Sequence, residues 1–195
     1  MDEVISDYRR IVDGVQSIVD GIDEDDWARP TPCTEWTVRD LLNHLVSGQR
    51  RLGRMARGEQ PPASGTDVLG ADPKGAFRDA TAEVEALAAT PGMLEKRLVT
   101  PLGEQPGSFV VVLQGNELMV HGWDLARSLG ASVDPLPADI ADRTLRMWQE
   151  RLARMHRPEG GPFAAEQPVA SDAPASDRLA AYLGRSADWA PPAAG

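Results

Sequence analysis

The sequence predicts an all-α protein, a bundle of amphipathic helices with a short helical tail packed on it. Apolar residues recur at steps of three and four in five segments, which is the period of a buried helix face. Segments rich in proline and glycine separate these stretches. The chain has 195 residues, of which 42% are hydrophobic and 26% charged, enough for one globular unit with a sizeable core.

The first two helices are predicted by their apolar stripes. The first stripe consists of Val4, Tyr8, Ile11, Val15, Ile18 and Ile22. Two prolines exclude an interior helix from residues 25–36. Thr37 then has the position of an N-cap, with Asp40 at the matching position of a capping box. The second helix is therefore expected from about Val38 to Arg57.

A long connection follows the second helix. Residues 58–72 contain three glycines and two prolines, and a connection of this length permits a crossover instead of a simple hairpin. The third helix carries Phe77, Thr81, Val84 and Leu87, and it must end before Pro91.

The second half of the chain is predicted to contain two long helices and one short one. Leu98 to Pro106 alternates weakly and holds two prolines and a glycine, which favours an extended loop over a strand. The fourth helix spans about Gly107 to Leu129 and ends at Gly130. The fifth begins near Pro137 or Ala138 and stops by Pro158.

We expect residues 1–156 to form a helical domain and residues 157–195 a C-terminal extension of the same domain. The extension is mostly loop, with one short helix from about Ser176 to Leu183 that is capped by Gly184. Its large apolar residues predict that it folds back over the bundle.

Composition excludes several classes of partner. A formal net charge of −10 argues against nucleic acid, and no apolar run approaches the roughly 20 residues that cross a bilayer. The acidic N-terminus is unlike a secretory signal, and the single cysteine, Cys33, fits a reducing compartment. We therefore expect a cytoplasmic monomer or homodimer.

The fourth helix carries a polar stripe on an otherwise apolar surface. At roughly 100 degrees per residue, its members fall in one narrow sector: Gln114, Glu117, His121, Asp124 and Ser128. A helix that is apolar on most sides is usually buried, so the stripe could line a site inside the bundle. It could equally be the solvated edge of an amphipathic helix.

His44 lies in the second helix of a chain with only three histidines. Together with Glu117 and His121, it has the pattern of a metal site with three ligands from two helices, which leaves a position open for a thiol or water. A hydrogen-bonded core histidine is the alternative for His44.

Asp40 and Asp124 are candidates for carboxylates that orient these imidazoles. Asp40 also suits a helix cap, and Asp124 a structural hydrogen bond. Cys33 lies eleven residues before His44, roughly 16 Å along a helical rise, which makes it a poor ligand for the same metal. His156 is expected to be exposed near a helix end.

Two segments carry a family resemblance: Thr31-Pro-Cys-Thr-Glu-Trp-Thr-Val-Arg-Asp-Leu-Leu-Asn-His-Leu-Val46 and Glu117-Leu-Met-Val-His-Gly-Trp-Asp-Leu-Ala126. They resemble the actinobacterial branch of the DinB superfamily, close to the metal-binding domain of mycothiol-dependent maleylpyruvate isomerase. The resemblance implies a four-helix bundle with a long crossover. It also implies that His44, Glu117 and His121 bind a divalent metal, and that mycothiol is the cosubstrate.

The chemistry expected from this resemblance is that of a metal-bound thiolate attacking a small electrophile, as a thiol transferase or isomerase. Zinc suits the ligand set best, and nickel, iron and manganese are possible. A non-catalytic metal-binding or partner-binding bundle is the alternative function. A metal-dependent hydrolase, with water in place of the thiol, is a third.

Overall fold

The computed structural model describes residues 2–59, 65–100, 103–153 and 164–192. Four long helices come first in the bundle: α1 (Asp2–Asp20), α2 (Val38–Arg57), α3 (Pro73–Ala88) and α4 (Gly107–Leu129). A short 3-10 turn, η1 (Glu24–Asp26), lies between α1 and α2, and a hairpin of β1 (Arg97–Thr100) and β2 (Gly103–Pro106) precedes α4. The chain continues with α5 (Ala138–Leu152) and α6 (Ala175–Tyr182). The prediction of a predominantly helical bundle is confirmed.

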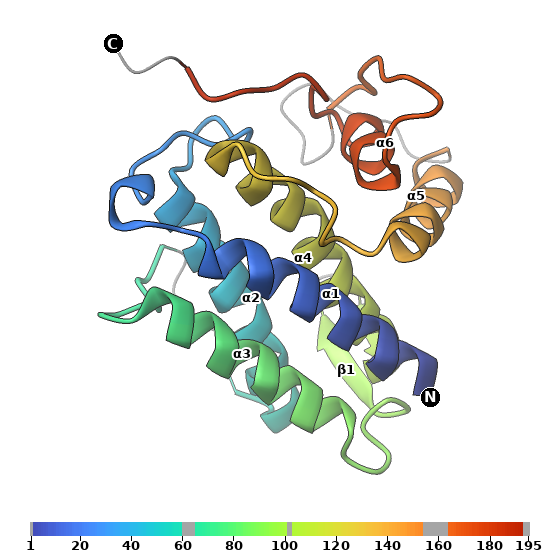
Figure 1. The fold of residues 1–195 in the computed structure, drawn as a ribbon. Coiled ribbons are helices and arrows are strands. Elements are labelled where there is room, and N and C mark those ends of the chain that lie inside the picture. The colour runs from blue at the N-terminus through green and yellow to red at the C-terminus, as the bar shows by residue number, and fades with distance from the viewer. Residues whose placement is uncertain (1, 60–64, 101–102, 154–163, 193–195) are drawn as a thin grey trace.

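The connection after α2 is a crossover between parallel neighbours (Figure 1). Arg39 near the start of α2 pairs with Asp67 just before α3, and Arg57 at the end of α2 pairs with Glu83 in the second half of α3. The two helices therefore run in the same direction, so the chain between them must return along the bundle.

α4 lies antiparallel to α2 and parallel to α1. Near its start, Gln114 lies beside Gly48 of α2, while His44, one turn earlier in α2, faces Glu117. This antiparallel pairing brings the polar stripe of α4 against the first half of α2, the half that carries His44.

The ends of α2 and α4 follow from local chemistry. The Thr37 side chain accepts a hydrogen bond from the backbone N–H of Asp40, and the Asp40 side chain accepts one from the backbone N–H of Thr37. Gly58 and Gly130 end the two helices with φ of 71° and 66°, a conformation that glycine adopts without a steric penalty. The predicted bounds of both helices agree with the structure.

The segment predicted as an extended loop is a β-hairpin, which corrects the expectation for residues 98–106. Arg97 pairs with Pro106, and Thr100 with Gly103, in an antiparallel register. Leu98 is buried between exposed neighbours, so the weak alternation did indicate a strand. Pro106 is compatible with the pairing because it lies at the end of the ladder, where a missing N–H costs little.

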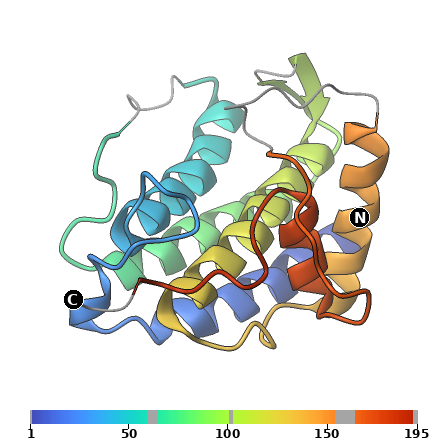
Figure 2. The same ribbon diagram turned by 90° about the horizontal axis from the view of Figure 1, so that it is seen from above.

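α5 and α6 pack on the outside of the bundle (Figure 2). Ion pairs of Arg143 with Asp7 and of Arg10 with Asp139 join α5 to α1. α6 contacts both α5 and α4, so the C-terminal tail covers the bundle as predicted. Within the described part of the chain, no helix has the length and apolarity needed to cross a membrane.

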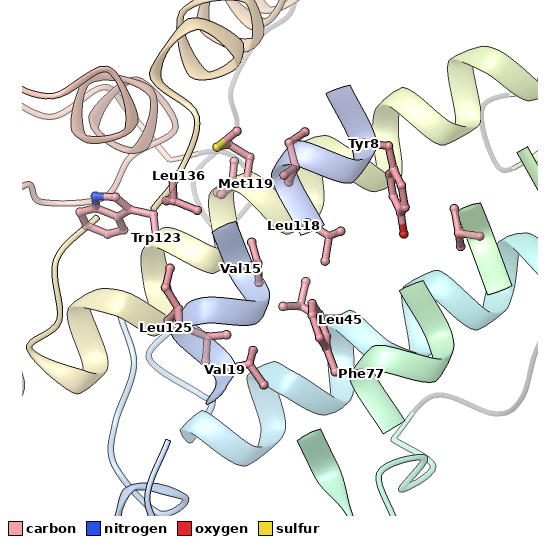
Figure 3. Close-up of a cluster of buried hydrophobic side chains, with 14 of the residues drawn as sticks. Tyr8, Val15, Val19, Leu45, Phe77, Leu118, Met119, Trp123, Leu125 and Leu136 are labelled. Atoms are coloured by element: carbon pink, nitrogen blue, oxygen red, sulfur yellow. The ribbon is translucent and has the colours of Figure 1, made fainter. Parts of the chain in front are cut away.

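A core of aliphatic and aromatic side chains fills the space between α1, α2, α3 and α4 (Figure 3). Glycines let α4 approach α1 closely. A Cβ at Gly122 would lie 2.7 Å from Val15 Cγ2, and one at Gly115 would lie 3.1 Å from Ile11 Cδ1.

Gly122→Ala is expected to lower the free energy of unfolding by about 1–3 kcal/mol, because the added methyl overpacks the α1–α4 contact. The matched control is Gly48→Ala in α2, where the nearest atom is the Gln114 side-chain oxygen at an ordinary 3.5 Å. That substitution should leave stability unchanged or raise it by up to about 1 kcal/mol through helix propensity. Urea unfolding measures both, and equal effects would contradict the steric argument.

Candidate metal centre

The polar stripe of α4 meets α2 at three side chains. His44 Nε2 lies 3.4 Å from Glu117 Oε2, and His121 Nε2 lies 3.5 Å from the same oxygen. The three donor atoms all lie within 4.8 Å of one another. His121 is only 8% exposed, whereas half of the Glu117 side chain is exposed, so the stripe leads from the surface at Glu117 into the interior at His121.

The spacing of these donor atoms fits a divalent metal. Bonds of about 2.1 Å at tetrahedral angles separate two ligand atoms by roughly 3.4 Å. The measured separations of Glu117 Oε2 from the two imidazole nitrogens match this value and exceed the usual length of a hydrogen bond. Two imidazoles and a carboxylate would also leave a fourth position open.

An aromatic ring borders the site. The Trp36 ring lies 4.6 Å from that of His44 and 6.0 Å from that of His121, measured between centroids. The loop before α2 fixes this tryptophan, because its backbone N–H donates to the carbonyl of Cys33 and its carbonyl accepts from the Thr31 hydroxyl. Trp36 therefore restricts how the His44 ring can turn.

The other ring nitrogen of His121 is held by a buried carboxylate. Nδ1 lies 2.8 Å from Asp124 Oδ2, and the Asp124 side chain has no exposed surface. An ionised carboxylate can only accept hydrogen bonds, so Nδ1 carries the proton. In the neutral imidazole this leaves a lone pair on Nε2, directed toward Glu117 and His44.

The charges of the site favour ionised carboxylates. Burial raises the pKa of Asp124, but the His121 hydrogen bond and the Arg185 guanidinium outweigh it and leave that pKa below its ordinary value. Burial likewise opposes ionisation of Glu117, yet its contacts with His121 and His44, whose protonated rings favour a charged carboxylate, lower its pKa. Half of the Glu117 side-chain surface is exposed, so the cost of burial is smaller there than at Asp124.

The sequence profile of the mycothiol maleylpyruvate isomerase N-terminal domain family matches residues 8–126, which include all three donor residues. The chain belongs to this family. The predicted resemblance to DinB-like proteins is thereby confirmed.

Proteins similar to this chain occur in Mycobacterium tuberculosis. An uncharacterized protein found in two strains of Mycobacterium tuberculosis is 34% identical over 92% of this chain and 96% of its own length. A second uncharacterized protein of the same species is 27% identical over 65% of this chain and 56% of its own. These relatives support an actinobacterial family.

The fold of the family domain also matches a solved structure. The crystal structure of the mycothiol-dependent maleylpyruvate isomerase superposes with a TM-score of 0.59, covering 77% of this chain and 71% of that one. Sequence identity is 16%, so this similarity concerns the fold.

Within the family domain, the two predicted orienting carboxylates have different positions. Asp124 contacts His121. The Asp40 carboxylate accepts hydrogen bonds from the backbone N–H and the hydroxyl of Thr37, which is the role of a helix cap. The contacts of Asp40 are therefore those of a helix cap and not those of a carboxylate that orients a metal-binding imidazole.

Cys33 lies closer to the centre than its sequence position suggested. Its Sγ is 3.9 Å from His121 Nδ1 and 3.4 Å from Asp124 Oδ2. The distance along α2 from Cys33 to His44 did not predict these contacts, because the loop before α2 folds back against α4. His156 lies outside the described residues.

Sequence reasoning missed Arg185 entirely. Its guanidinium donates from Nε to Asp124 Oδ1 at 3.2 Å and from a terminal nitrogen to Oδ2 at 3.0 Å. The two residues are 61 positions apart, so no spacing in the sequence relates Arg185 to Asp124, even though the segment Asp177 to Arg185 resembles the ending of short family members.

Proposed function

We propose that this protein binds one divalent metal through His44, Glu117 and His121 and acts as a mycothiol-dependent transferase or isomerase on a small electrophile. The observation that carries the proposal is the convergence of the three donor atoms within 4.8 Å of one another, with Glu117 Oε2 at 3.4 and 3.5 Å from the two imidazole nitrogens, as tetrahedral coordination requires. Zinc is the preferred ion, and nickel, iron and manganese accept the same ligand types. Family membership supports mycothiol as the thiol.

The side chains of the chain have separate tasks in this proposal. Glu117 would supply negative charge beside the two imidazoles, and the contact with Asp124 keeps the proton of His121 on Nδ1, so that Nε2 would be the ligand atom. The tilted Trp36 ring packs against His44 and shields it on one side. A divalent metal held there would supply an open coordination position at which a thiol loses its proton near neutral pH.

His121→Ala is expected to abolish metal binding, because it removes the most buried of the three donors. Elemental analysis should find about one metal ion per wild-type chain purified without a metal column, and much less than that in the variant. The metal content of Glu117→Gln is compared with that of Glu85→Gln. Glu85→Gln is the control, because Glu85 pairs with Arg9 on the surface. Unchanged metal content in His121→Ala would refute the ligand assignment.

The activity is tested by incubating the metal-loaded protein with mycothiol and a panel of electrophiles that includes maleylpyruvate. Consumption of the electrophile should require both mycothiol and the metal, and it should be lost in His121→Ala. Turnover that proceeds equally well without the thiol would favour a metal-dependent hydrolase. Metal binding with no turnover on any electrophile would favour a non-catalytic metal-binding bundle.

A further inference from the structure

A buried chain of polar contacts extends outward from His121. Asp124 Oδ2 accepts from His121 Nδ1 at 2.8 Å and from Arg185 at 3.0 Å, while Asp124 Oδ1 accepts from Arg185 Nε at 3.2 Å. The Asp124 side chain is completely buried, and that of Arg185 is 15% exposed. One carboxylate therefore receives a forked guanidinium on one side and the imidazole on the other.

The C-terminal tail delivers Arg185 to this position from outside the part of the chain that matches the family profile, residues 8–126. The segment after α6 runs over α4 toward the loop between α1 and α2 (Figure 1, Figure 2). Gly184 makes the turn possible with φ of 94°, and a Cβ there would lie 2.6 Å from Ala164 Cβ. The backbone N–H of Arg185 then donates to the carbonyl of Ala180.

A second contact anchors the tail on α4. Asp177 of α6 accepts hydrogen bonds of 2.6 Å from both Trp123 Nε1 and Arg127. Trp123 and Asp124 are neighbours in α4, so both α6 and Arg185, which lies three residues after α6, are held next to the helix that carries Glu117 and His121. The position of the Arg185 guanidinium is thus determined by a packed element and not by a free chain end.

The guanidinium also supplies the positive charge that this buried carboxylate requires. Cys33, His121 and Asp124 offer donor atoms within 4.8 Å of one another, the pattern of a possible second metal group. However, Arg185 already lies 3.0 Å from Asp124 Oδ2 and 4.0 Å from Cys33 Sγ. Since arginine stays protonated in proteins, it provides a permanent cation there.

We propose that Arg185 is a positioning residue of the metal centre: it holds Asp124, which in turn fixes the tautomer and orientation of His121. This inference rests on the proposed metal site. Partners of metal-bound histidines contribute to metal affinity by restricting the ring and raising its basicity. The C-terminal tail therefore completes the metal centre, although none of its described residues contacts the three donor atoms.

Arg185→Ala tests the inference through metal affinity, measured by competition for zinc against a chromophoric chelator. Loss of an orienting partner should weaken binding by about 10–100-fold. The matched control is Arg178→Ala, another tail arginine, which pairs with the partly exposed Asp142 of α5. A partly exposed ion pair of this kind contributes little to the stability of the fold, so the zinc affinity of the control should stay within about twofold of wild type.

Two further variants separate positioning from general stability. If Arg185 acts through Asp124, then Arg185→Ala should cause little additional loss of zinc affinity in an Asp124→Asn background. Arg185→Lys keeps the charge without the fork and should recover part of the affinity. The visible spectrum of the cobalt-substituted protein should shift in Arg185→Ala and not in Arg178→Ala.

The outcomes distinguish the two proposals. A wild-type protein that binds no metal refutes the proposed function. A wild type that binds zinc, a His121→Ala variant that does not, and an Arg185→Ala variant with unchanged affinity would together refute only the role of Arg185. If Arg185→Ala fails to fold, then Arg185→Lys decides, because wild-type zinc affinity in that folded variant overturns the role of the forked contact.

Discussion

Removal of the divalent metal is expected to lower the midpoint of thermal unfolding by roughly 10 °C. A ligand that binds only the folded state stabilises it by about 4 kcal/mol when its free concentration is a thousand times the dissociation constant. For a chain of this size, each kcal/mol shifts the midpoint by roughly 2–4 °C. The three donors belong to α2 and α4 and converge only in the folded bundle.

The measurement compares thermal scans of the metal-loaded protein with and without a chelator. His121→Ala is the control, since its midpoint should be the same in both conditions. Re-addition of zinc should restore the wild-type midpoint. A wild-type midpoint that does not respond to the chelator would contradict a metal site preformed by the fold.

Trp123→Ala is expected to lower the free energy of unfolding by about 3–5 kcal/mol, the usual cost of truncating a buried tryptophan. The ring is 1% exposed and lies on the side of α4 that faces α6. Its indole N–H donates to Asp177, and the Arg127 guanidinium lies 5.1 Å from its centroid. Truncation would both leave a cavity and remove one of the two hydrogen bonds that Asp177 of α6 accepts from α4.

Two variants make this result specific. Trp123→Phe refills part of the cavity without restoring the hydrogen bond, so its loss should be smaller. Val99→Ala changes a side chain that is 75% exposed and should stay within about 0.5 kcal/mol of wild type. Urea unfolding measures the free energy of unfolding of all three variants, provided that its slope against urea concentration is the same for each. A loss below 1 kcal/mol in Trp123→Ala would show that α6 docks without this ring.

The helical part of the fold was predictable because its signals are local. Thr37 and Asp40 determine where α2 begins, and Gly130 determines where α4 ends, through contacts within a few residues. The hairpin was predicted wrongly as a loop, since the prolines in its sequence outweighed a weak alternation. The pairing partner that stabilises such a short strand is not visible in the strand itself.

Only the three proposed metal ligands of the candidate site and Asp124 could be predicted from the sequence, and not the other residues around them. The spacing of Glu117 and His121 puts both on one face of a helix, and the segment around His44 matches the same family. The contacts of Cys33 and Arg185 with Asp124 join positions 91 and 61 residues apart. Periodicity contains no information about such pairs, because they depend on how a loop and a tail fold over α4.

The position of the proposed metal ligands on α2 and α4 has a consequence for motion. His44 and Glu117 are 73 positions apart, and α3 and the hairpin lie within the loop that they enclose. A metal held between them would act as a cross-link over this long loop, the kind that restricts an unfolded chain most. Separation of α2 from α4 would then require release of a ligand, so metal exchange and opening of the bundle would be a single event.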